Sequence, residues 1–226
     1  LRVVQLIPVG DILVEYSSGS LSPAMCVSIS AHMHFCDSCR DENLRLTEIG
    51  GSLLTEVAPE ALQTSALDEV FSKIDTEVDV AVTQQPVKSN EIQRGVELKS
   101  LPAMIQNLIP TSEPKWKFLS PSLRAAAIPV GENSCELALH KIKAGGSTPS
   151  HDHNGREVIV VLKGSFSDED GIYAEGDFIV HHPGEVHRPQ ASQNQECICL
   201  SVLEAPLKLT GAFHRFLNPF FSFNPQ

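Results

Sequence analysis

The sequence lacks long hydrophobic runs and any recognisable export signal. Its longest apolar stretches, such as Val158 to Leu162, are far too short to span a bilayer. The N-terminus has no basic segment followed by a long apolar one. The first residue is Leu rather than Met, which leaves room for residues before it. These absences predict a cytoplasmic protein without membrane contacts.

Positive charge is also scarce. The chain has 17 Lys and Arg residues against 28 Asp and Glu residues, a net charge of -11, and no two Lys or Arg residues are adjacent. Nucleic-acid phosphates repel such a chain unless basic residues cluster, so direct nucleic-acid binding is not expected. An acidic surface instead suits a basic protein partner.

Length and cysteine use indicate two domains without a disulfide framework. A chain of 226 residues predicts two units of roughly 100 residues, each with a small core of its own. Six cysteines could form disulfides, but Cys36 and Cys39 form C-x-x-C beside a histidine, and Cys197 and Cys199 form C-x-C. We therefore favour metal binding or redox chemistry, with Cys197 and Cys199 as a candidate redox pair.

The first 74 residues show helical patterns. Ser22-Pro23 predicts an N-cap and a helix that runs to about Cys36. A second helix is expected from Asp37, weakened at Gly50-Gly51, and a third from Pro59-Glu60. Apolar residues of the third helix repeat at three and four positions: Leu62, Ala66, Leu67, Val70, Phe71 and Ile74. This stripe packs within the domain or binds a partner.

The later part of the chain shows strand patterns. Residues 75–99 have no sustained period and are expected to form a linker. After Trp116, short alternating segments separated by glycines predict an all-β barrel or sandwich in residues 100–226, with a hairpin turn at residues 167–171. Five of the ten Phe residues lie between Phe213 and Phe223, and we expect them to close one end of the barrel.

A histidine and glutamate motif lies in this β region. It reads Gly145-x5-His151-x-His153-x3-Glu157-x6-Gly164, followed by Gly176 and Pro183-Gly184-x2-His187. Alternate side chains of a strand share a face, so His151, His153 and Glu157 are expected to point into the barrel from one strand. His187 arrives from a later hairpin to complete a metal site. Three imidazoles and a carboxylate suit Zn, Mn, Fe, Ni or Cu.

A second candidate metal site lies in the helical region. His32, Cys36 and Cys39 are spaced four and three residues apart, which places them on one helical face or on a helix end and the following turn. Thiolate and imidazole ligands favour zinc, and a closed site needs a fourth ligand, which the spacing does not identify. The alternative is two buried cysteines and a surface histidine.

These motifs resemble known families. The β-region motif resembles the two cupin motifs, although the second reads His182-Pro183-Gly184 in place of Pro-x-Gly, with Ala191 where Asn is common. The helical region resembles the zinc-binding anti-sigma domain. The matching segments are Tyr16-x2-Gly19-x-Leu21-Ser22, His32-x3-Cys36-x2-Cys39-Arg40, Gly50-Gly51, Cys197-Ile198-Cys199-Leu200, Ala205-Pro206-Leu207 and Pro219-Phe220-Phe221. Together they resemble the ChrR family of anti-sigma factors over nearly the whole chain.

The resemblance implies a helical zinc-type anti-sigma domain followed by a metal-containing cupin. It also implies zinc in one or both domains, with Mn, Fe or Ni as other candidates in the barrel. The family supplies its fourth helical zinc ligand as a His before the first helix, but Leu6-Ile7-Pro8 contains none here. Cys26, His34, water or another chain could substitute, or the site is weak or lost.

The function implied by the resemblance is regulatory. Such a protein binds and inhibits an extracytoplasmic-function (ECF) sigma factor and releases it in response to singlet oxygen or related oxidants. The first alternative is a metal-dependent cupin enzyme, of the dioxygenase or isomerase type, with an accessory helical domain. The second is a metal-binding or small-ligand module whose helices form a homodimer.

Overall fold

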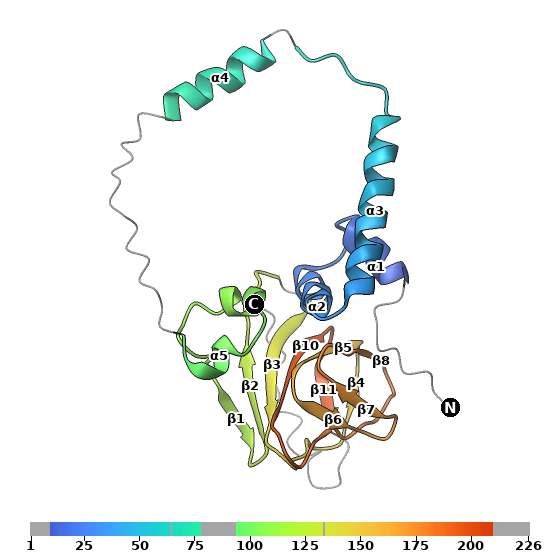
Figure 1. Ribbon diagram of the computed structural model, residues 1–226, viewed down its shortest axis with the longest axis vertical. Coiled ribbons are helices and arrows are strands. Elements are labelled where there is room, and N and C mark those ends of the chain that lie inside the picture. The colour runs from blue at the N-terminus through green and yellow to red at the C-terminus, as the bar shows by residue number, and fades with distance from the viewer. Residues whose placement is uncertain (1–9, 64, 78–93, 133, 210–226) are drawn as a thin grey trace.

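The computed structural model describes residues 10–63, 65–77, 94–132 and 134–209 (Figure 1). The helices are α1 (Gly10–Ser17), α2 (Pro23–Met33), α3 (Asp37–Thr55), α4 (Ala66–Glu77), α5 (Val96–Lys99) and α6 (Ala103–Leu108). The strands are β1 (Lys117–Ser120), β2 (Leu123–Ala127), β3 (Glu136–Ile142), β4 (His151–His153), β5 (Glu157–Lys163), β6 (Ser165–Ser167), β7 (Ile172–Ala174), β8 (Phe178–His181), β9 (Gln190–Ala191), β10 (Cys197–Leu203) and β11 (Leu207–Leu209).

The strands form an antiparallel, cupin-like β structure. Six strands make the main sheet in the order β1-β2-β3-β10-β5-β8, and two smaller sheets have the orders β7-β6-β9 and β11-β4. The hairpin predicted at residues 167–171 is confirmed, since β6 pairs with β7 across it. The fold class predicted from the sequence, helices followed by an all-β cupin, is therefore confirmed.

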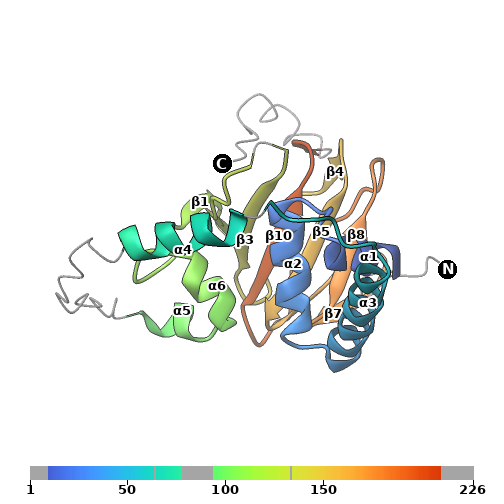
Figure 2. The same ribbon diagram turned by 90° about the horizontal axis from the view of Figure 1, so that it is seen from above.

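Helix α2 covers the outer face of the main sheet. It packs against β5 and β10 (Figure 2), and both of these strands are buried along nearly their whole length. One face of each strand is turned toward the barrel interior and the other toward the helix, which explains why Val158 to Leu162 is a continuous apolar run rather than an alternating one.

The buried side chains form two clusters, but these are not divided between helices and barrel as expected. One cluster joins Met25 and Ile29 of α2 to Val160 of β5 and Leu200 of β10. The second, which includes Ile159, lies among the strands alone. A helix with an apolar face is stabilised only when something covers that face, and here the sheet does so. The helical N-terminal part therefore shares a core with one face of the main sheet.

The helix starts follow the predicted caps better than the helix ends do. Ser22 accepts a hydrogen bond from the Met25 amide and Pro23 is the first helical residue, as predicted. Helix α2 ends at Met33, three residues before the predicted end at Cys36.

Of the two other predicted helix starts, one is confirmed and one was wrong. Helix α3 begins at Asp37, as predicted, and continues through Gly50-Gly51 to Thr55, because a helical glycine costs only about 1 kcal/mol and does not forbid the helix. Helix α4 begins at Ala66 rather than at Pro59, with the Ser65 carbonyl accepting from the Glu69 amide.

The region between helices and barrel is partly described. Helix α4 continues to Glu77, and α5, with Leu98 buried, lies within the last residues of the expected linker. Residues 78–93 and the phenylalanine-rich segment 213–223 lie outside the described residues. Within the described part of the chain, no helix combines the length and hydrophobicity that a membrane crossing requires.

Candidate metal centres

Four side chains of the cupin motif converge inside the barrel. His151 and His153 lie on β4, and Glu157 is the first residue of β5, so the expectation that all three share one strand was wrong. Residues 154–156 turn the chain between the two strands and bring Glu157 back beside the histidines. His187 follows β8 and is held opposite His151 by a backbone bridge with two hydrogen bonds. We name these four residues the cupin cluster.

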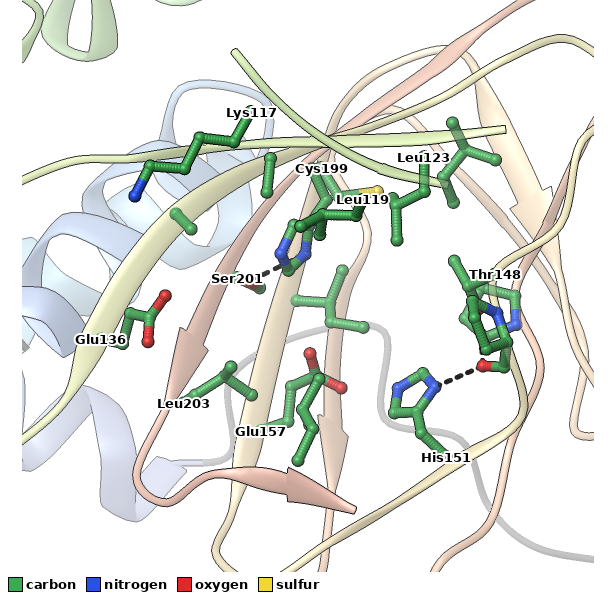
Figure 3. Close-up of a pocket in the computed structure, with 18 of the residues that line it drawn as sticks. Lys117, Leu119, Leu123, Glu136, Thr148, His151, Glu157, Cys199, Ser201 and Leu203 are labelled. Atoms are coloured by element: carbon green, nitrogen blue, oxygen red, sulfur yellow. Dashed lines mark hydrogen bonds between the residues drawn. The ribbon is translucent and has the colours of Figure 1, made fainter. Parts of the chain in front are cut away.

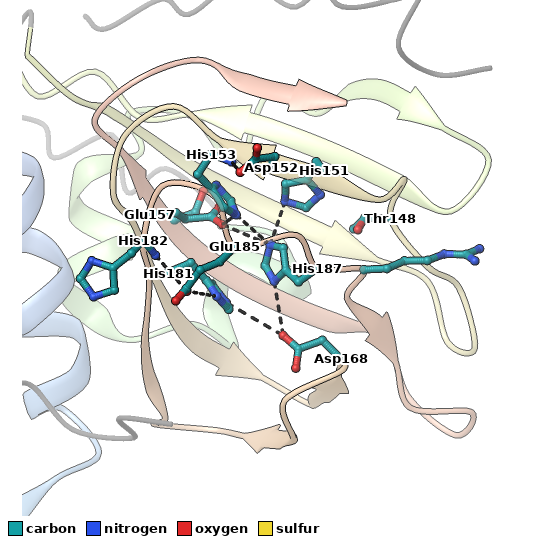
Figure 4. A network of polar contacts seen from close by, with 12 residues as sticks. Thr148, His151, Asp152, His153, Glu157, Asp168, His181, His182, Glu185 and His187 are labelled. Carbon is teal, nitrogen blue, oxygen red and sulfur yellow. Dashed lines mark hydrogen bonds and ion pairs between the residues drawn. The ribbon is translucent and has the colours of Figure 1, made fainter. Parts of the chain in front are cut away.

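The donor atoms of the cupin cluster face one another (Figure 4). Nε2 of His187 lies 2.9 Å from Nε2 of His151 and 3.1 Å from Nε2 of His153. Oε2 of Glu157 lies 3.4 Å from Nε2 of His153, is buried, and has no hydrogen-bond partner among the described residues. The four donor atoms all lie within 4.8 Å of one another. An orphaned carboxylate oxygen among converging imidazole nitrogens fits a divalent cation.

The polar groups behind the ligands fix the orientation of their rings. His151 donates from Nδ1 to the Pro149 carbonyl at 2.9 Å, and His187 donates from Nδ1 to Asp168 Oδ2 at 3.3 Å. Each of these bonds leaves the Nε2 lone pair for the centre of the site, an arrangement common among metal-binding histidines. Asp168 was predicted only as part of a turn, and its role could not be read from local spacing.

Electrostatic interactions within the barrel stabilise the protonated form of His187. Burial alone would lower the pKa of His187, but its hydrogen bond with Asp168 and its ion-pair contact with Glu157 at 3.6 Å outweigh burial and raise the pKa to about 9. Burial, with the neighbouring histidines, lowers the pKa of His153 to about 4. Burial opposes ionisation of Glu157, yet its contact with His187 and the other nearby imidazoles keep its pKa well below the usual range.

A cavity of about 630 Å³ lies against the cupin cluster (Figure 3). His151, Glu157 and His187 line one part of it. Much of the remaining wall is apolar and includes Phe118, Leu119, Leu123, Ile142, Ile159 and Phe166. A small molecule could therefore reach the cluster from a largely apolar space.

The predicted redox pair borders this region. Cys197 and Cys199 are buried, unbridged thiols of β10 whose sulfur atoms lie 3.5 Å apart, and Cys199 lines the cavity. The hydrogen bond from Cys197 and burial raise the pKa of Cys199 well above its usual value. The two sulfurs are close enough to react with each other after oxidation, but the raised pKa of Cys199 disfavours its thiolate.

The three candidate ligands of the helical region, which we name the helical set, also converge. His32 lies in the last turn of α2, Cys36 occupies the N-cap position of α3, and Cys39 lies in the first turn of α3. Their three donor atoms lie within 4.8 Å of one another. This is the second of the two predicted arrangements, a helix end and the following turn. Burial raises the pKa of Cys39 to about 12, whereas for Cys36 the hydrogen bonds with Ser38 and Cys39 outweigh burial and lower its pKa.

The fourth ligand of the helical set is not among the described residues that converge there. Of the two substitutes considered, neither Cys26 nor His34 belongs to the group, and the Cys26 thiol donates to the Leu21 carbonyl. Residues 6–8 lie outside the described residues. The donor chemistry fits zinc with three protein ligands in place.

His32 also connects the helices to the barrel. Its Nδ1 donates to the Gly176 carbonyl at 2.6 Å, and its Nε2 lies 3.3 Å from Cys39 Sγ. Gly176 lies in the turn between β7 and β8, and the His32 ring also contacts Phe178 at the start of β8. A candidate ligand of the helical set is thus hydrogen-bonded to the strand connection that leads to the cupin cluster.

Two histidines outside the predicted ligand sets lie near the cupin cluster: His140, which lines the same cavity, and His181. His181, at the end of β8, is buried and its ring is parallel to that of His153, with centroids 5.7 Å apart. His182 is exposed, and His214 lies outside the described residues.

Comparisons with known proteins cover helices and barrel together. A family model described as the ChrR cupin-like domain matches residues 106–206. The anti-sigma-E factor ChrR of Cereibacter sphaeroides is 30% identical over 212 residues, which are 93% of this chain and 94% of that protein. The crystal structure of Rhodobacter sphaeroides SigE in complex with the anti-sigma ChrR matches with a TM-score of 0.72 and 27% identity, and the match covers 89% of this chain and 100% of the matched chain.

Proposed function

The chain belongs to the ChrR family of anti-sigma factors, and from this membership we propose that it binds and inhibits an ECF-type sigma factor. It acts as a regulatory binding protein rather than as an enzyme. The observation that carries the proposal is an apolar helical surface that the rest of the described chain leaves uncovered.

Helix α4 carries the clearest part of this surface. Leu67, Val70, Phe71 and Ile74 repeat at three and four residues, and each side chain is more than half exposed, at 62%, 53%, 60% and 53%. A helix of this kind is not stable in water without a partner for its apolar face. The stripe noted in the sequence is thus a binding surface rather than part of the core.

Helix α3 carries a second exposed apolar surface, separate from that of α4. Its C-terminal half exposes Ile49, Leu53 and Leu54, and it projects away from the barrel (Figure 1). Exposed apolar side chains that gather on one element mark protein-binding sites. The acidic chain as a whole complements a basic partner and accelerates its association.

Coexpression with candidate sigma factors, followed by copurification and affinity measurement, tests this function. Phe71→Asp and Val70→Asp are expected to weaken binding at least 30-fold, since a central interface residue contributes about 2 kcal/mol or more. Ile172→Asp is the matched control, because Ile172 of β7 is 79% exposed on the barrel. Unchanged affinity in the α4 variants would remove α4 from the interface, and a chain that copurifies only with itself would support the homodimer alternative.

The proposal also covers the metals that the chain binds and the oxidant that causes release of the sigma factor. The cupin cluster would hold a divalent transition metal such as zinc, Mn, Fe or Ni, and the helical set would hold zinc, which would tie α2 to α3. We infer that singlet oxygen or a related oxidant alters the cupin cluster or the Cys197–Cys199 pair. The hydrogen bond from His32 to Gly176 is the route by which such a change reaches the helices. The two states must differ in affinity for the sigma factor.

A further inference from the structure

A second set of donor atoms lies behind the cupin cluster, on the opposite edge of the His187 ring. It consists of His187 Nδ1, Asp168 Oδ2 and His181 Nε2, which all lie within 4.8 Å of one another (Figure 4). The Asp168 oxygen is 3.3 Å from His187 Nδ1 and 4.0 Å from His181 Nε2. We name these three residues the rear cluster.

The Asp168 carboxylate is held in one orientation by its own turn. Its Oδ1 accepts hydrogen bonds from the amides of Asp170 and Gly171, at 2.9 and 3.2 Å, and from the Tyr173 hydroxyl at 3.0 Å. The side chain is fully buried. These bonds occupy one oxygen and aim the other, Oδ2, at the two histidines.

His181 presents an unsatisfied nitrogen to the same oxygen. The residue is 3% exposed, and its buried Nε2 has no hydrogen-bond partner among the described residues. Its other nitrogen, Nδ1, lies 3.6 Å from Glu185 Oε2 on the side away from Asp168. A buried polar atom without a partner is rare, and in a cluster of ligand atoms it points to a missing ion.

We propose that the rear cluster binds a second divalent transition-metal ion, with the His187 imidazolate shared between this ion and the one in the cupin cluster. Two nitrogens and a carboxylate oxygen are a donor set for Zn, Co or Cu. Ligands around one tetrahedral ion lie about 3.4 Å apart for bonds near 2.1 Å, so the observed separations need only small shifts.

Binding of the two ions displaces the protons of His187 one at a time. An ion at Nε2 leaves His187 with one proton, on Nδ1, which is donated to Asp168. The second ion takes the place of that proton, which passes to solvent, and Asp168 becomes a ligand instead of a hydrogen-bond acceptor. The inference rests on the proposed cupin metal, since His187 is shared.

Cobalt binding to the full chain tests the inference. The metal-free protein is titrated anaerobically with Co(II) alone, and bound cobalt is counted and examined by electron paramagnetic resonance. The wild type is expected to bind one more ion per chain than Asp168→Asn or His181→Ala, and to show exchange coupling between two ions that both variants lose. His182→Ala is the matched control and should equal the wild type, because this neighbour is exposed. The helical set is identical in every variant, so it does not affect the differences.

The outcomes separate the two metal proposals. If His181→Ala binds as many ions as the wild type and neither shows coupling, the rear cluster binds no ion and Asp168 only orients His187. If His151→Ala and Glu157→Gln also match the wild type, the barrel binds no metal, which overturns the cupin centre as well. Circular dichroism of each variant verifies that it has folded, so that a lost ion reports a lost ligand.

Discussion

His187 is the residue on which the proposed metal binding inside the barrel depends. One of its nitrogens faces the other three members of the cupin cluster and the second faces Asp168, so both edges of one ring are committed to ionic partners. Without metal, the two carboxylates hold a proton on this imidazole and raise its pKa to about 9, from an ordinary value of 6.5. A metal ion at Nε2 must displace that proton.

Metal affinity of the barrel is therefore expected to depend on pH. Between about pH 6.5 and 9 the metal-free His187 is protonated, whereas His151 and His153, with lowered pKa values, are already neutral. Binding of an ion at the cupin cluster releases one proton from His187, so the affinity of this cluster should rise about tenfold per pH unit and level off above pH 9. Chelator competition across this range measures it. Asp168→Asn should move the curve to lower pH, and a flat wild-type profile would contradict the assignment.

At the scale of elements, the β7–β8 turn adds a contact between the helices and the barrel to the packing of α2 on β5 and β10. Gly176 has a φ of +93° and accepts the hydrogen bond from His32. A Cβ atom at this position would lie 2.7 Å from the Cβ of Phe35, in the turn between α2 and α3. The glycine thus permits both the turn and the close approach of the helices.

Gly176→Ala is expected to destabilise this contact. Gly131→Ala is the matched control, since Gly131 also has a positive φ, +73°, but no heavy atom lies within 4 Å of the added Cβ. Both variants carry backbone strain of order 1 kcal/mol or more, and Gly176→Ala adds about 1–3 kcal/mol from overpacking against Phe35. Denaturant unfolding of the full chain measures the difference. Equal free energies of unfolding for the two variants would show that the helices shift away from the added methyl group without a loss of stability.

At the scale of the molecule, one cluster of buried side chains joins the helices to the barrel sheet. It includes residues of α2, β5 and β10, while a second cluster lies among the strands alone. Packed interiors are dense and transmit displacement, so under the proposed function we expect a rearrangement at the cupin cluster to reach α2 through β5 and β10. The exposed faces of α3 and α4 are where the proposed binding of the sigma factor would then change.

Oxidant-driven release of the sigma factor tests this coupling. The purified complex is exposed to photosensitised singlet oxygen, and free sigma factor is measured over time. The wild type and His182→Ala are expected to release it, whereas His151→Ala and His187→Ala should release it at least about tenfold more slowly, because they lack the assembled cupin cluster. Equal release from all four proteins would exclude a role of the cluster in sensing.

The sequence by itself determined the kinds of elements and the main metal-ligand candidates. Caps, periodicity and glycine punctuation are local signals, so Ser22-Pro23 and the β6–β7 hairpin were predictable. The convergence of the candidate ligands of the cupin motif was predictable for the same reason, because a short segment carries three of them. The exposed stripe of α4 was visible as a pattern, but the pattern alone did not distinguish core from binding surface.

Only the tertiary structure decided what these elements do together. The separation of His151 and Glu157 onto two strands, the place of Asp168 and His181 behind His187, and the contact of His32 with Gly176 all depend on which distant segments pair. Likewise, α2 covers the sheet, so that the helices share a buried cluster with one face of the barrel sheet. Such contacts arise from packing between residues far apart in sequence, and no local period or spacing encodes them.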